Sequence, residues 1–131
     1  MLWNGWPWTR IILLFTGMAL ILSSIQVGMF HSRQNYRHWA QWLPVIAGPI
    51  LGLLALIIAF YNAVVLRQIF VGLAIITSLA SLFGFYLHFT GVGERVDGYR
   101  AENFLVGPPI IMPLMFSGIS LLGLIAIYWR W

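Results

Sequence analysis

Residues 43–63 read LPVIAGPILGLLALIIAFYNA and contain no Asp, Glu, Lys or Arg. A helix rises about 1.5 Å per residue and the hydrocarbon core of a bilayer is about 30 Å thick, so about 20 apolar residues span it. Three further uncharged runs of similar length cover residues 11–30, 69–87 and 108–128. None of the runs alternates polar and apolar residues as a barrel strand would. The sequence therefore predicts an all-α integral membrane protein with four transmembrane helices in an up-down bundle.

The composition favours a lipid environment. Of the 131 residues, 61% are hydrophobic and 8% are charged, whereas soluble domains are about 45–50% apolar and about 25% charged. The run at residues 11–30 is longer than the apolar part of a signal peptide, which has about 7–15 residues. We therefore expect residues 1–131 to form a single transmembrane domain, in a multi-pass protein of a bacterial cytoplasmic membrane.

Trp and Arg residues mark the expected membrane surfaces. Five Trp flank the first and last runs and predict an aromatic belt on the side of the termini, namely Trp3, Trp6, Trp8, Trp129 and Trp131. That side also holds Arg10, Arg67 and Arg130, and the opposite side holds Arg33, Arg37, Arg95 and Arg100. The positive-inside rule does not decide between three and four arginines. We expect cytoplasmic termini, because the two longer polar loops then face outward.

The formal net charge of +4 suits contact with the headgroups of anionic membrane lipids. The seven basic residues are scattered and form no basic stripe, so we expect no nucleic-acid partner.

Small residues in the second run predict close helix contacts. Helices in lipid associate through close backbone approach, which small side chains permit. Gly48 and Gly52 have a GxxxG spacing, and Ala55 and Ala59 continue it at four-residue intervals. We expect this ridge to pack within the chain; a contact with another subunit is the alternative.

The connections differ in length and charge. Residues 64–68 suggest a tight turn between antiparallel helices, and residues 89–107 form the longest loop, in which three Gly supply turns. That loop holds Glu94, Arg95, Asp97, Arg100 and Glu102. Their alternating signs suit local ion pairs on a solvated loop, or docking on a partner protein.

Three histidines are the main candidates for chemistry. The four-helix layout places His31, His38 and His88 on one side of the membrane. A b-type haem needs axial imidazoles from two directions, so His31 and His88 are candidate haem ligands. Because all three lie at helix ends or in a loop, however, we expect them to be interfacial hydrogen-bonding residues, with haem ligation as the alternative. A quinone or pigment could instead use the aromatic cluster around residues 83–89 together with His88.

The sequence lacks the residues that several functions require. No Cys is present, no acid lies in any apolar run and no HExxH spacing occurs. Thiol chemistry and proton-coupled exchange are thereby excluded, and we expect no enzyme activity.

The leading hypothesis is a non-catalytic accessory subunit of a larger membrane complex, such as a respiratory or photosynthetic electron-transfer assembly, with other membrane subunits and lipids as partners. A membrane anchor that binds haem b or quinone through His31 and His88 is the first alternative. A small oligomeric channel or transporter, with the Gly48/Gly52 ridge at its interface, is the second.

Overall fold

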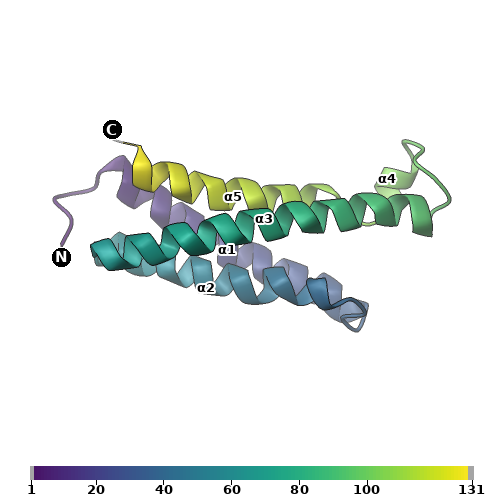
Figure 1. The fold of residues 1–131 in the computed structure, drawn as a ribbon, viewed down its shortest axis with the longest axis horizontal. Helices are drawn as coiled ribbons and strands as arrows, with labels where there is room; N and C mark the ends of the chain where they lie inside the picture. Colours follow the sequence, from purple (N-terminus) through teal and green to yellow (C-terminus); the bar gives the residue numbers. More distant parts are fainter. Residues whose placement is uncertain (1, 130–131) are drawn as a thin grey trace.

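The computed structural model describes residues 2–129 as an up-down bundle of long helices (Figure 1). The elements are α1 (Trp8–Arg33), the 3-10 turn η1 (Trp39–Gln41), α2 (Trp42–Phe60), α3 (Val64–Arg95), the short α4 (Asn103–Val106) and α5 (Ile111–Tyr128). The four long helices are each long and apolar enough to cross a membrane. The predicted multi-pass all-α fold is therefore confirmed. Arg130 and Trp131, expected at the membrane surface, lie outside the described residues, as does Met1.

The bundle consists of two helix pairs. The most extensive contacts join α1 to α2 and α3 to α5, while the α1–α5 and α2–α3 contacts are smaller. We call the end with the chain termini the terminal end and the end with η1 and α4 the loop end. Figure 1 shows the two pairs close together at the terminal end and diverging toward the loop end.

Two helix boundaries differ from the prediction. The turn between α2 and α3 lies at residues 61–63, and the expected turn at residues 64–68 is already the first turn of α3. At the other end, α3 continues to Arg95, so residues 90–95 are helical and not a loop. Gly91 and Gly93 do not make turns there. They let the returning chain pack closely, because a Cβ would lie 3.2 Å from Pro108 Cγ at Gly91 and 2.5 Å from Tyr99 Cζ at Gly93.

Helix α3 is longer than the hydrocarbon core of a bilayer is thick. With 32 residues, α3 is about 48 Å long, against about 30 Å for the bilayer core. The chain then folds back through a short ordered cap, in which the Tyr99 ring stacks on Phe89 at 5.1 Å and Asn103 Nδ2 donates to the Gly98 carbonyl at 2.6 Å. Asp97 and Gly98 make the turn with φ of 62° and 107°.

The predicted small-residue ridge lies inside the bundle. Gly48, Gly52, Ala55 and Ala59 are all buried. A Cβ at Gly52 would lie 2.8 Å from the Gly17 carbonyl oxygen, and one at Gly17 would lie 2.7 Å from the Gly52 carbonyl oxygen. The structure thus places this ridge against α1 of the same chain.

Candidate functional site

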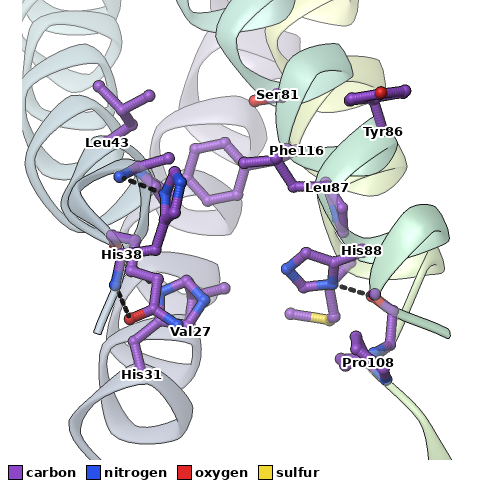
Figure 2. Close-up of a pocket in the computed structure, with 18 of the residues that line it drawn as sticks. Val27, His31, His38, Leu43, Ser81, Tyr86, Leu87, His88, Pro108 and Phe116 are labelled. Atoms are coloured by element: carbon purple, nitrogen blue, oxygen red, sulfur yellow. Dashed lines mark hydrogen bonds between the residues drawn. The ribbon is translucent and has the colours of Figure 1, made fainter. Parts of the chain in front are cut away.

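A cavity of about 430 Å³ lies at the loop end, between the two helix pairs (Figure 2). Apolar and small side chains from all four long helices line its deep part, namely Val27, Leu43, Ala47, Ala80, Gly84, Leu87, Met112 and Phe116. His31, His38 and His88 line it nearer the loops. Cofactor sites have volumes of about 300–1,000 Å³, and this cavity is within that range, with an apolar deep part and polar side chains toward the loops.

The cavity has a floor formed by Phe116. This ring reaches from α5 across the bundle, so that a Cβ at Gly48 on α2 would lie 2.6 Å from its Cζ. Phe116 is 2% exposed and belongs to the continuous core that fills the rest of the bundle. The cavity is therefore a feature of the loop end alone.

His31 is fixed by the start of α2. It lies in the last turn of α1, is buried, and its Nδ1 is 2.9 Å from the Gln41 carbonyl oxygen. A carbonyl oxygen only accepts, so Nδ1 carries the proton and donates, and Nε2 of the neutral ring keeps its lone pair. The Tyr36 ring contacts His31 edge-on at 6.3 Å and stacks on Trp42 at 4.0 Å. These contacts hold the imidazole in one orientation.

His88 is fixed by the start of α5. Its Nδ1 donates to the Pro109 carbonyl oxygen at 2.8 Å. This carbonyl is available because Pro113, four residues later, has no N–H to donate to it. Nε2 of the neutral His88 ring therefore also keeps its lone pair.

The two imidazoles meet across the cavity. The His31 and His88 ring centres are 6.4 Å apart and the ring planes make an angle of 67°. Figure 2 shows the rings on opposite sides of the opening, one on the α1–α2 pair and one on the α3–α5 pair. Within residues 2–129, neither Nε2 has a hydrogen-bond partner. The site thus presents two oriented lone pairs of neutral imidazoles.

His38 differs from the other two. Its Nδ1 accepts a hydrogen bond from the Ala40 N–H at 3.2 Å and so caps η1. The proton of the neutral ring is therefore on Nε2, which leaves His38 without a free lone pair in this arrangement. It is exposed and stacks on Trp39 at 5.7 Å.

The histidines lie toward the far ends of α1 and α3. His31 and His88 stand 23 and 24 residues after the first residues of α1 and α3, which is about 35 Å along each helix. The hydrocarbon core of a bilayer is about 30 Å thick. A membrane whose core begins at the first residues of these helices would place the histidine end of the cavity at its surface and the apolar part within it.

Charged residues surround the opening. Glu94 and Arg95 line the cavity, and Arg95 also lines a smaller pocket of about 210 Å³ with Gln34, Val96, Val106, Gly107 and Pro108. Asp97, Arg100 and Glu102 line neither pocket. Acidic and basic side chains form no salt bridge within residues 2–129. The ion pairs expected for the loop are therefore absent among the described residues.

The aromatic cluster expected at residues 83–89 does not form one wall of the cavity. Of the aromatic residues at 83–89, only Tyr86 lines the cavity, while Phe83 stacks outside it on Trp39 at 6.2 Å. Sequence reasoning missed Phe116 and the two carbonyl partners of the histidines. Pro113 was the available signal for the Pro109 carbonyl, whereas nothing in the sequence singles out Gln41.

The cavity offers few side chains that could bind a metal ion without a cofactor. Among the described residues, no group of three or more His, Cys, Asp or Glu side chains could hold a metal ion. The pair of imidazoles is the donor set that the site offers.

Comparison with protein-family models, with curated proteins and with solved structures found no match to this chain.

Proposed function

We propose that this chain is an electron-transfer subunit of a larger membrane assembly, in which His31 and His88 bind one b-type haem at the loop end of the bundle. One observation carries the proposal, namely the two facing imidazoles with ring centres 6.4 Å apart. Imidazole is a haem ligand, and two imidazoles at this separation would be near enough to hold a single iron between them.

The hydrogen bonds support metal ligation. Imidazoles that bind a metal usually donate their other N–H to a carbonyl or carboxylate, which fixes the ring and raises its basicity. His31 and His88 both do so, through Gln41 and Pro109. Two ligands do not complete the shell of a bare ion such as zinc, which takes four. A haem supplies the remaining nitrogens itself, so two imidazoles suffice.

The same hydrogen bonds argue against a quinone as the ligand of these histidines. A quinone carbonyl only accepts hydrogen bonds and needs a donor. With Nδ1 donating to main-chain carbonyls, the Nε2 atoms of neutral His31 and His88 can only accept. Binding a quinone through them would require breaking a main-chain hydrogen bond or adding a proton.

The place in a larger assembly is part of the proposal. The four spanning helices take up most of residues 2–129, and the connections at the loop end are short. On this proposal, electrons come from and go to partner subunits. We further propose cytoplasmic termini in a bacterial membrane, which puts the haem near the outer surface. No observation favours the channel alternative, because the Gly48/Gly52 ridge that it would use packs on α1.

The proposal is tested by titrating the purified detergent-solubilised chain with ferric haem. We expect one haem per chain and a shifted Soret band. His31→Ala and His88→Ala each lose this spectrum, while His38→Ala, the matched control, keeps it. Absence of saturable binding, or equal behaviour of all three variants, contradicts the proposal.

A further inference from the structure

The smaller pocket adjoins the histidine cavity on its aqueous side. Gln34, Arg95 and Pro108 line both, so the two volumes are neighbours that share a wall. A ligand in the cavity can therefore extend one edge toward the pocket.

Arg95 is placed on the histidine face of α3. It follows His88 by seven residues, which at about 100° per residue is nearly two full turns and about 10 Å along the helix. Its side chain forms no salt bridge or hydrogen bond with residues 2–129. Its guanidinium is thus a cation available to a ligand, and its Nε lies 4.0 Å from the position of a Cβ on Gly91, one turn after His88.

Gln34 adds a neutral donor. Its Oε1 accepts a hydrogen bond from Gln41 Nε2 at 2.8 Å, which orients the amide and leaves its NH₂ group to donate elsewhere. Gln41 is also the residue whose carbonyl orients His31. The donor at the pocket and the imidazole in the cavity are therefore held by one residue.

We infer that this pocket receives the propionate carboxylates of the bound haem, with Arg95 as their counter-ion and Gln34 as a hydrogen-bond donor. The inference depends on the proposed function. Both propionates leave the same edge of the macrocycle, so a haem with its apolar edge in the membrane directs them to the aqueous side. Guanidinium binds carboxylates in a bidentate manner.

The carboxylate of Glu94 would repel the propionates of the ligand if it lay in the same pocket. Glu94 lines the cavity but not the smaller pocket. Arg95 lines both. The carboxylates of the ligand would therefore meet the Arg95 cation in the smaller pocket, which Glu94 does not line.

The test compares haem with its dimethyl ester, in which both propionates are neutral, on the purified full chain. We expect the wild type to bind haem about tenfold more tightly than the ester, as a charge-assisted hydrogen bond provides. Arg95→Gln should weaken binding of haem about tenfold and leave that of the ester nearly unchanged. Arg33→Gln is the matched control, since Arg33 is on the same membrane side and lines neither pocket.

The outcomes separate the two proposals. If haem binds with the His31- and His88-dependent spectrum but Arg95→Gln behaves like Arg33→Gln, or the ester binds as tightly as haem, the inference is overturned and the haem site stands. If neither haem nor the ester binds the wild type, both proposals fail. Because the ester is tested on the wild type, the result does not depend on folding of a variant.

Discussion

The two ends of the bundle are built from the same four long helices but are packed in opposite ways. At the terminal end Phe70 fills the space between the pairs, and a Cβ at Gly123 would lie 2.6 Å from its ring. At the loop end the same pairs diverge around a cavity of about 430 Å³. The difference shows that one end provides the close packing and the other is free to hold a ligand.

Main-chain carbonyls at the helix ends show the same contrast. At the terminal end Trp3 Nε1 donates to Ile58 O at 2.8 Å and Arg10 Nε to Ala59 O at 2.8 Å, which satisfies the last turn of α2. At the loop end the acceptors Gln41 O and Pro109 O hold histidines. The Trp3 and Arg10 donors only satisfy the helix end. Each histidine donates from Nδ1, and its Nε2 has no hydrogen-bond partner within residues 2–129.

The largest expected effect is the loss of packing at the terminal end. Phe70→Ala removes a fully buried ring and should reduce the free energy of unfolding by about 3 kcal/mol, the lower limit for buried Phe in soluble cores. Leu87→Ala, at the cavity wall, should cost clearly less because its side chain is only partly packed. Reversible unfolding in mixed detergent measures both. Equal losses would break the contrast between the ends.

The second largest expected effect concerns the close approach of the α1 and α2 backbones. Gly52→Ala places a methyl group 2.8 Å from the Gly17 carbonyl and should cost about 2 kcal/mol as α1 and α2 separate. The matched control is Gly72→Ala on α3, where nothing lies within 4 Å of the added Cβ. The same unfolding assay is used. A Gly52→Ala variant as stable as the control would mean that the α1–α2 contact is looser than described.

A larger side chain in the cavity should abolish haem binding and change the stability of the fold only slightly. Ala80→Leu adds a larger side chain to the cavity wall, so we expect a change in stability below about 1 kcal/mol, since the added atoms enter open space. Haem binding, followed by the Soret band, should be lost. Retained binding would show that the ligand does not occupy this volume.

The smallest effect concerns the carbonyl that holds His88. Pro113→Ala restores an N–H that can compete for Pro109 O, so the affinity for haem should fall about threefold, within the range of one net hydrogen bond. Pro49→Ala, the other proline inside a helix, is the control because no histidine bonds the carbonyl that it leaves free. Indistinguishable affinities would remove the assigned role of Pro113.

Much of the fold could be predicted from the sequence, because length and the absence of charge are local properties. The ends of α3 could not. Gly91 and Gly93 look like turn residues until the packing of Pro108 and Tyr99 on them is known. The topology predicted that His31 and His88 share a membrane side. The distance between the two rings and the carbonyl partners of the rings depend on how the two helix pairs diverge. The spacing of residues along the chain does not predict that divergence.

The proposed ligation of one iron by His31 and His88 can be tested directly. Electron paramagnetic resonance of ferric haem added to the purified chain does so, because two imidazole ligands give low-spin iron. We expect a low-spin signal in the wild type and in His38→Ala, and its loss in His31→Ala and in His88→Ala. A high-spin signal in the wild type, or a low-spin signal that survives His88→Ala, would contradict it.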